Sequence, residues 1–321
     1  MIIYDGLNAP GLKRLPRVLA VGAFDGVHRG HQRLLSHVCR MAAEYGVEAA
    51  IMTFEPIPAQ VFRDQGHENT RLSTKDERNK ELVKYCVGSA VVVRFDEAFR
   101  RTSAYEFARD ILVQRLGVVA LVASKTHSFG RDAEADVQRI TELGMDLGFE
   151  VHVLPPILVD GRRINSTDVR RLLWAGDVAA ASDWLGRPYD LAGKVVPGRH
   201  IGRTIGFPTA NLRPVPEKLV PGDGVYACAA RIEPAGAAQT EWAPAAVSIG
   251  NTPTVGDGGR TIEAHLIHPP SRDLTGETMR LLFLARVRDN HKFDSVDALT
   301  RQIERDVRVT RREFDGRDLS L

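Results

Sequence analysis

The first half of the chain alternates short apolar runs with segments whose apolar residues recur at helical spacing. The apolar runs, each bounded by breaking residues, are 18–21, 49–54, 90–95, 118–123 and 151–154. Helical spacing predicts helices at 32–45, 75–86, 104–116 and 134–147. Because strands that alternate with helices form βαβ units, we expect a mostly parallel sheet covered by helices on both sides.

The pattern changes near residue 186. Short β-like runs separated by Gly and Pro follow at 191–196, 225–232, 245–249, 261–267 and 279–285. Such strands, separated by turns, predict a small antiparallel β-barrel. An amphipathic segment at 295–314 predicts a helix after the barrel. We therefore expect an α/β domain at 1–185 and a β-barrel domain at 186–321.

Composition and charge are those of an ordinary soluble globular protein. Of the 321 residues 43% are hydrophobic, and the net charge of +2 gives no basic footprint for nucleic acid. Cys39, Cys86 and Cys228 are too far apart for a metal motif or a disulfide framework, as is typical of a reducing cytoplasm. No apolar run reaches the roughly 20 residues of a membrane span. We expect a cytoplasmic protein with no nucleic-acid or membrane partner, and the sequence leaves a homo-oligomer open.

The turn at 22–31 holds the first candidate site. It follows the apolar run 18–21 and leads into the predicted helix, so His28 and His31 lie at a helix N-terminus. Backbone N–H groups and partial positive charge there suit a nucleoside triphosphate, and two His donors can stabilise charge on a phosphate under attack. The simpler interpretation is a surface turn with two solvated histidines. The strand–turn–helix context favours function.

Two further signals lie in the second half. In the segment 202–211, glycines and a proline predict a tight loop, and Thr209 and Asn211 offer the neutral oxygen ligands that suit Mg²⁺ carried by a nucleotide. The alternative is a loop whose Thr and Asn bond their own backbone. Glu263 and His265 share one face of a predicted strand. Glu263 is either a general base or a solvated surface residue. The chain has neither a P-loop nor a protein-kinase glycine loop.

The segment after the last α/β strand, Asn165-Ser-Thr-Asp-Val-Arg170, supplies another candidate. Ser166 or Thr167 would cap a helix at 168–174, and Arg170 would lie in its first turns, near a phosphate at the same edge of the sheet. A helix cap followed by a surface arginine is the simpler interpretation.

Taken together, these segments resemble the bacterial bifunctional riboflavin kinase/FMN adenylyltransferase (FAD synthetase) family over essentially the whole chain. The matching segments are Val21-Gly-Ala-Phe-Asp-Gly-Val-His-Arg-Gly-His31, Thr53-Phe-Glu-Pro56, Phe129-Gly130, Ser166-Thr-Asp-Val-Arg170, Leu185-Gly-Arg-Pro-Tyr189, 202–211, Gly224-Val-Tyr226, Pro253-Thr254, Glu263 and 287–295. The resemblance implies a Rossmann-like nucleotidyltransferase domain at 1–185 and a riboflavin kinase barrel at 186–321.

The resemblance implies two reactions, with Mg²⁺ and with ATP as substrate. The barrel would phosphorylate riboflavin to FMN, and the first domain would join FMN to AMP, giving FAD and pyrophosphate. The implied catalytic residues are Glu263 as base in the barrel and His28, His31 and Arg170 in the first domain. The implied nucleotide-binding residues are Gly22, Phe24, Asp25, Ser166, Thr167, Gly202, Thr204, Gly206, Pro208, Thr209 and Asn211, of which Thr209 and Asn211 would hold the metal. The implied flavin-binding residues are Phe54, Thr126, Phe129, Arg288 and Phe293.

Departures from the family pattern lie mostly in the first half. Ile57 stands where the family usually has His. Ser124-Lys-Thr-His127 stands where it usually has a Gly, two acidic or amide residues and an aromatic. Thr275 replaces a usual Tyr in the barrel. One alternative is therefore a riboflavin kinase whose first domain has a weakened or retargeted nucleotidyltransferase activity. Another is a non-catalytic flavin- or nucleotide-binding regulator, which would not need Glu263 or the two histidines.

Overall fold

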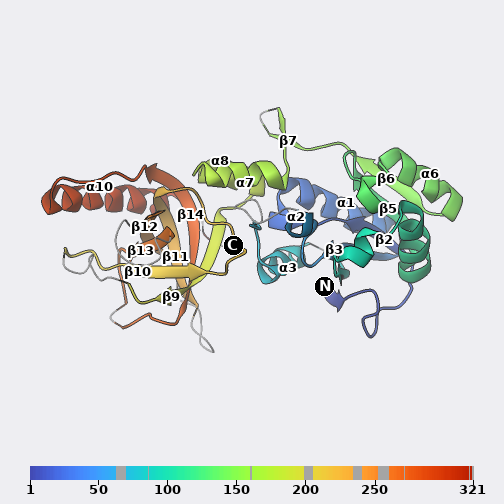
Figure 1. The fold of residues 1–321 in the computed structure, drawn as a ribbon, viewed down its shortest axis with the longest axis horizontal. Helices are drawn as coiled ribbons and strands as arrows, with labels where there is room; N and C mark the ends of the chain where they lie inside the picture. Colours follow the sequence, from blue (N-terminus) through green and yellow to red (C-terminus); the bar gives the residue numbers. More distant parts are fainter. Residues whose placement is uncertain are drawn as a thin grey trace. The chain divides into compact units, whose positions relative to one another are not determined.

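The computed structural model describes residues 1–62, 70–85, 87–159, 161–198, 205–233, 241–251, 260–270, 272–317 and 319. The chain divides into two compact units, Met1–Ser166 and Thr167–Leu321. Figure 1 shows the ribbon of both units coloured along the sequence.

The first unit is built on a six-stranded sheet in the order β1-β4-β3-β2-β5-β6. Every neighbouring pair in it is parallel. The strands are β1 (Ile2–Asp5), β2 (Arg17–Val21), β3 (Glu48–Phe54), β4 (Ser89–Val93), β5 (Val118–Ser124) and β6 (Glu150–Leu154). A short separate hairpin follows, made of β7 (Leu158–Val159) and β8 (Arg162–Arg163). The central strands are buried on both faces, as a parallel sheet between helices requires.

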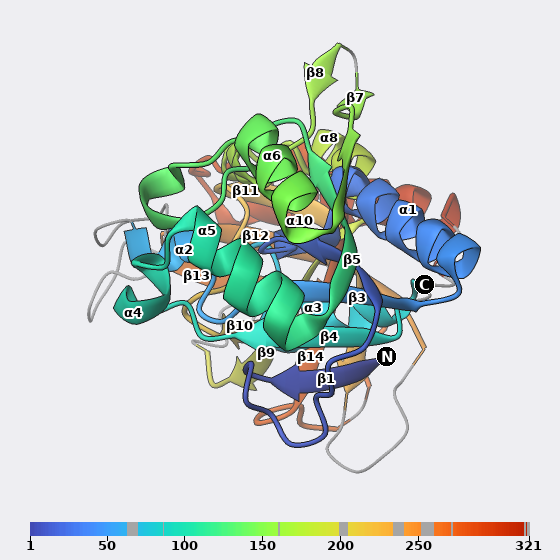
Figure 2. The same ribbon diagram turned by 90° about the vertical axis from the view of Figure 1, so that its right-hand side faces the viewer.

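Helices cover both faces of this sheet. They are η1 (Asp25–Val27), α1 (Arg29–Tyr45), α2 (Pro58–Phe62), α3 (Lys75–Val83), α4 (Glu97–Arg100), α5 (Ala104–Glu106), η3 (Phe107–Leu116), η4 (Arg131–Ala133) and α6 (Val137–Leu147). Successive residues of a strand point to opposite faces. Leu19 therefore packs in the core beneath η3 and α6, and Val18 packs in the core beneath α1 and α3. Figure 2 shows α1 and α6 on either side of β5.

The second unit is a closed antiparallel barrel in the order β10-β13-β12-β11-β14-β9. Its strands are β9 (Tyr189–Val196), β10 (Ala210–Pro214), β11 (Gly224–Glu233), β12 (Ala243–Asn251), β13 (Arg260–Leu266) and β14 (Thr278–Arg288). Two helices, α7 (Ser166–Trp174) and α8 (Val178–Leu185), precede it, and α10 (Val296–Asp315) follows it. α8 packs on β9 and β14, and α10 packs on β11, β12 and β14.

The expected fold class, a parallel α/β sheet followed by an antiparallel barrel with a terminal helix, is confirmed. Four strands were not expected. β1 is a short edge strand at the start of the chain, β7 and β8 form the two-residue hairpin, and β10 lies at the end of the segment that we interpreted as a loop. The segment 107–116 is a π-helix instead of a continuous α-helix. α7 begins at Ser166, so neither Ser166 nor Thr167 precedes it as a cap.

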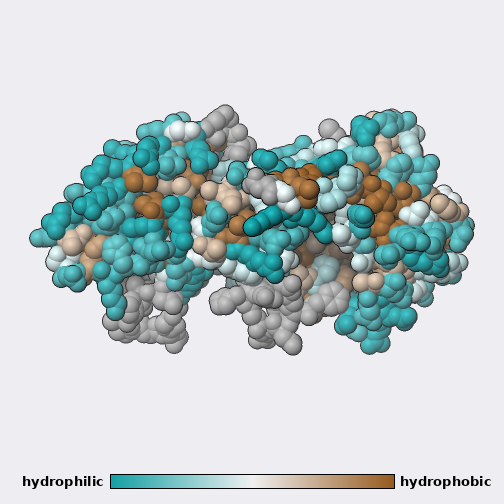
Figure 3. Space-filling view, turned by 90° about the horizontal axis from the view of Figure 1, so that it is seen from above, coloured by the Kyte–Doolittle hydropathy of each residue, from teal (hydrophilic) through white to brown (hydrophobic). Residues whose placement is uncertain are grey.

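The surface shown in Figure 3 is mostly hydrophilic, with separate hydrophobic patches. Scattered apolar residues of this kind are normal on a protein surface. Within the described part of the chain, none of the helices has both the length and the apolar character needed to cross a bilayer.

Candidate active sites

The turn from β2 into α1 is held in an unusual backbone conformation. Phe24 and Val27 both have positive φ, at 49° and 41°, which costs free energy in residues other than glycine. Asp25 stabilises this turn. Its buried carboxylate accepts hydrogen bonds from the backbone N–H groups of Leu72 (3.0 Å) and Ser73 (3.1 Å). The hydroxyl of Ser73 in turn accepts from Gly26 N at 2.9 Å. Asp25 therefore fixes the loop that carries the histidines and lines neither of the cavities described below.

His28 and His31 lie together at the N-terminus of α1. His28 is the N-cap, and its Nδ1 accepts a hydrogen bond from His31 N at 3.3 Å. The two rings stack with centroids 3.7 Å apart, and the buried ring of Phe24 lies 5.2 Å from that of His31. Ser166 joins them, because its hydroxyl donates to the carbonyl oxygen of Asp25 at 3.1 Å.

The electrostatics of this pair favour an anionic ligand. Burial, followed by the neighbouring charges of His28 and His127, lowers the pKa of His31 well below its ordinary value. In the described part of the chain, His31 Nδ1 is shielded from solvent and has no hydrogen-bond partner. A phosphate oxygen placed there would supply that partner and raise the pKa of the imidazole.

A cavity of about 240 Å³, here called the histidine cavity, opens at this helix N-terminus. Its lining includes three cationic side chains, Arg33, Lys125 and Arg163, and no carboxylate among the residues described. Its full lining is His28, Gly30, His31, Arg33, Leu34, Ser124, Lys125, Thr126, His127, Leu154, Pro155, Pro156, Ile157, Arg163, Ile164, Asn165 and Ser166. A concave wall of one charge sign concentrates ligands of the opposite sign, so this cavity suits a polyphosphate.

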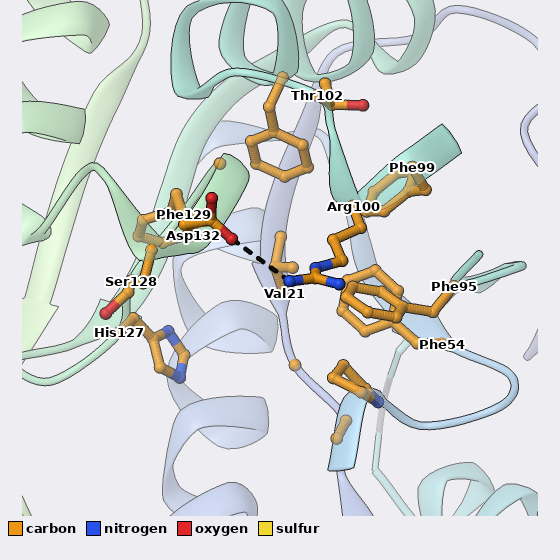
Figure 4. A pocket seen from close by; sticks show the side chains of 16 residues that line it. Val21, Phe54, Phe95, Phe99, Arg100, Thr102, His127, Ser128, Phe129 and Asp132 are labelled. Carbon is orange, nitrogen blue, oxygen red and sulfur yellow. Dashed lines mark ion pairs between the residues drawn. The ribbon is translucent and has the colours of Figure 1, made fainter. Parts of the chain in front are cut away.

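A second cavity, of about 340 Å³ and here called the aromatic cavity, lies at the carboxyl ends of β2 and β3 (Figure 4). Its lining is Val21, Gly22, Ala23, Phe54, Pro58, Phe95, Phe99, Arg100, Thr102, Phe107, His127, Ser128, Phe129, Gly130, Asp132 and Ala133. Phe54 and Phe95 meet edge to face at 5.4 Å, and Arg100 pairs with Asp132 at 3.5 Å. Phenylalanine rings arranged in this way suit a planar, largely apolar ligand.

The barrel brings Glu263 and Asn211 together. They are directly opposite in the antiparallel pair β10–β13, so both side chains point to the same face. Ser248 of β12 is opposite Glu263 on the other side. His265, two residues along, has its Nδ1 2.9 Å from the carbonyl oxygen of Pro208. The outward residues of β13 are half-buried while Ile262 and Ala264 fill the core. The strand period thus turns Glu263 away from the core.

The donors around Asn211 fit Mg²⁺ carried by a nucleotide. A Cβ added to Gly198 would come within 2.7 Å of the Asn211 Cγ, so only glycine leaves room for that amide. Thr209 and Asn211 supply neutral oxygens, with the Glu263 carboxylate opposite Asn211. Few protein ligands and several phosphate oxygens are the usual environment of Mg²⁺. Among the described residues, no group of three or more His, Cys, Asp or Glu side chains forms a separate metal site.

The remaining predicted site residues have varied positions. Phe54 and Phe129 line the aromatic cavity, as does Gly22, whereas Thr126 lines the histidine cavity. Arg288 makes a bidentate pair with the buried Asp306 of α10 and lies 5.6 Å from the Phe293 ring. Arg170 is buried on α7 in the second unit, which also holds Thr167. Gly206 and Pro208 lie in the loop before β10, and Gly202 and Thr204 lie outside the described residues.

Sequence reasoning missed several cavity residues. Phe95 and Phe99 follow the carboxyl end of β4, where ligands of a parallel sheet bind, and that position was an available signal. Arg33 and Arg163 carry no motif. Ile57, noted as a departure, is buried and lines neither cavity.

Comparison with known proteins covers both units. A profile described as FAD synthetase matches residues 13–168, and one described as riboflavin kinase matches residues 185–314. The bifunctional riboflavin kinase/FMN adenylyltransferase of Escherichia coli K12 is 36% identical over 93% of both chains. That of Pseudomonas fluorescens is 34% identical over 92% of both. A crystal structure described as a macrolide-efflux protein from Streptococcus pneumoniae superposes with a TM-score of 0.85 at 29% sequence identity. The match covers 97% of this chain and 99% of that chain.

Proposed function

Because the chain belongs to the bifunctional riboflavin kinase/FMN adenylyltransferase family, we propose that it makes FAD in two steps. The barrel transfers the γ-phosphoryl group of ATP to riboflavin, giving FMN. The first unit then joins FMN to the α-phosphorus of a second ATP, releasing pyrophosphate. One observation carries the assignment of FAD formation to the first unit. A cationic cavity with two stacked histidines shares a lining residue with an aromatic cavity that suits a flavin ring.

In the first unit, the aromatic cavity receives the flavin ring and the histidine cavity receives the nucleotide. A phosphate oxygen of FMN attacks the α-phosphorus of ATP, and the bond to pyrophosphate breaks. His28 and His31 donate hydrogen bonds to the oxygens on which charge develops. Arg33, Lys125 and Arg163 attract the phosphates that leave. The family pattern also implies a catalytic role for Arg170.

In the barrel, Glu263 accepts the proton of the ribityl hydroxyl as that oxygen attacks the γ-phosphorus. Phosphoryl transfer depends mainly on positioning and charge stabilisation, so the placement of Glu263 beside Asn211 matters more than strong basicity. Mg²⁺ held by Thr209 and Asn211 would neutralise phosphate charge. The bidentate ion pair between Arg288 and Asp306 joins β14 to α10, beside the proposed flavin site.

Two variants test the assignment of one reaction to each unit. Glu263→Gln should lower FMN formation from riboflavin by about 10²-fold or more and leave FAD formation from supplied FMN unchanged. His31→Ala should do the opposite, with a loss of about 10²–10³-fold. Chromatography of the flavins formed with ATP measures both rates. An equal loss of both activities in either variant would contradict the assignment.

Lys125 favours a second candidate function for the first unit, a nucleotidyltransferase with a changed nucleotide substrate. It replaces a usual acidic or amide residue and lines the histidine cavity, where it changes the charge beside the nucleotide. A retargeted transferase would join FMN to another nucleotide. Incubation with riboflavin, Mg²⁺ and each of ATP, CTP and GTP separates the candidates. FAD from ATP supports the main proposal, and a dinucleotide carrying another base supports the second.

A further inference from the structure

His127 connects the two cavities of the first unit. Of the residues that the structure describes, it is the one that lines both the aromatic and the histidine cavity. The segment bends back here, because His127 N donates to the carbonyl oxygen of Ser124 at 2.9 Å. The ring stands edge-on to Phe129 with centroids 6.0 Å apart, and Figure 4 shows it at the border of the aromatic cavity beside Ser128.

The surroundings of His127 differ on its two sides. Phenylalanine rings line the aromatic cavity beyond Phe129, while Arg163 and His31 are the charged or titratable groups that interact with His127 from the histidine cavity. Lys125 lines the same wall. A ligand that occupied both cavities would therefore lie beside the imidazole where its apolar part meets its anionic part.

We propose that His127 recognises the phosphate of FMN and so makes the first unit select the phosphorylated flavin over riboflavin. This inference rests on the proposed function. An imidazole N–H donates to a phosphate oxygen, and a flavin without the phosphate leaves that donor without its partner. A site with a buried donor discriminates against a ligand that lacks the acceptor more strongly than an apolar wall does.

Steady-state kinetics of FAD formation from FMN and ATP test the role of His127. The key variant is His127→Phe, which keeps a ring against Phe129 and removes both nitrogens. Loss of a hydrogen bond to a charged group should raise the KM for FMN by at least about 10-fold. The KM for ATP should change by less than about threefold. His127→Gln, which retains an N–H donor, should recover most of the loss.

Lumiflavin, which has the flavin ring and neither ribityl chain nor phosphate, separates phosphate recognition from damage to the cavity. Its inhibition constant against FMN should stay within about twofold in His127→Phe, while the KM for FMN rises. Phe99→Leu serves as the matched control, because loss of an aromatic wall should raise both constants together. The thermal unfolding transition of the first unit, followed in each preparation of the full chain, shows that this unit is folded.

The outcomes are distinct. If the unaltered protein forms no FAD from FMN and ATP, the proposed function fails and this inference fails with it. If it forms FAD and His127→Phe leaves the KM for FMN within about twofold, the inference alone is wrong. A parallel rise of the FMN and lumiflavin constants would also overturn it, because His127 would then act only as a wall of the aromatic cavity.

Discussion

At the scale of single residues, burial of histidines makes the first unit sensitive to acid. Burial, followed by the charge of Arg163, lowers the pKa of His127 to about 4 from an ordinary 6.5. The unfolded chain therefore binds a proton that the folded chain does not between these pH values, so stability falls as the pH falls from about 6.5 to 4. The pKa of His31 is lowered in the same direction.

We expect His127→Phe to reduce this acid sensitivity. The free energy of unfolding of the unaltered first unit should fall by an extra 1–3 kcal/mol or so across that interval relative to the variant. Urea unfolding of the full chain at pH 6.5 and pH 4.5, followed through the first unit's transition, measures the difference. If the free energy of unfolding depends on pH identically in the two proteins, the folded structure does not lower the pKa of His127.

Some residues of the candidate sites could be recognised from the sequence, and others could not. His28 and His31 could be singled out because they stand in a motif between a predicted strand and a predicted helix, whereas Glu263 was identified as the base only through the family resemblance. Asp25 stands in the same motif, but its contact with Leu72 and Ser73 joins positions 47 and 48 residues apart, which no local pattern encodes. His127 was visible only as a departure, and its place between two cavities needed the folded chain.

At the scale of elements, the chain around Phe129 depends on one close backbone approach. Gly130 has φ of +77°, and a Cβ there would lie 2.4 Å from the backbone nitrogen of Ala104, at the start of α5. Backbone cannot give way as a flexible side chain can. Phe129 and Ala104 belong to one core, so a displaced Gly130 would move the wall of the aromatic cavity.

Gly130→Ala should therefore destabilise the first unit by about 2 kcal/mol or more and slow FAD formation, with the riboflavin kinase rate unchanged. Gly148→Ala is the matched control. Its φ of +81° is also positive, but its ψ of 36° lies in the left-handed region that other residues adopt at modest cost, whereas Gly130 has a ψ of −177°. No atom lies within 4 Å of a Cβ added to Gly148. The control should lose only about 1 kcal/mol and keep the rate of FAD formation. Thermal unfolding and both enzyme assays distinguish the two variants, and equal effects would contradict the steric argument.

Periodicity predicted most elements and failed where the backbone departs from regular geometry. Long apolar runs such as β3 and β5 are recognised from their own residues. β10 was not, because its pairing with β9 and β13 closes the barrel and its apolar content is low. The π-helix η3 has the same residue pattern as an α-helix at this length, so the sequence alone could not separate them.

At the scale of the whole molecule, α7 and α8 associate with the barrel. Gly222 N donates to the carbonyl oxygen of Leu173 at 2.8 Å, and Arg286 donates to that of Ala175 at 3.2 Å. Trp184 of α8 is buried. The boundary that we expected at 185/186 would separate these helices from the strands on which they pack, whereas the division into compact units falls at 166/167.

We expect a fragment spanning 167–321 to fold with its own core and to keep the riboflavin kinase activity. A fragment spanning 186–321 should be less stable by roughly 3 kcal/mol or more, because it exposes the apolar surface that Trp184 and its helix cover. Urea denaturation of both fragments gives the comparison. Equal unfolding midpoints would show that α7 and α8 add nothing to the stability of the barrel and would favour the boundary at 185/186.

Because His127 lines both cavities, the proposed sites for FMN and for the nucleotide adjoin. FAD, which contains both parts, would therefore bind as a bivalent ligand. FMN and the nucleotide each bind on their own, but once joined they hold both cavities through a single molecule, so either half that detaches stays at high effective concentration near its cavity. FAD should then dissociate more slowly than FMN or ATP, which its release rate would register. We therefore expect bond formation in this unit to make its own product the tightest occupant, so that release of FAD limits the turnover rate.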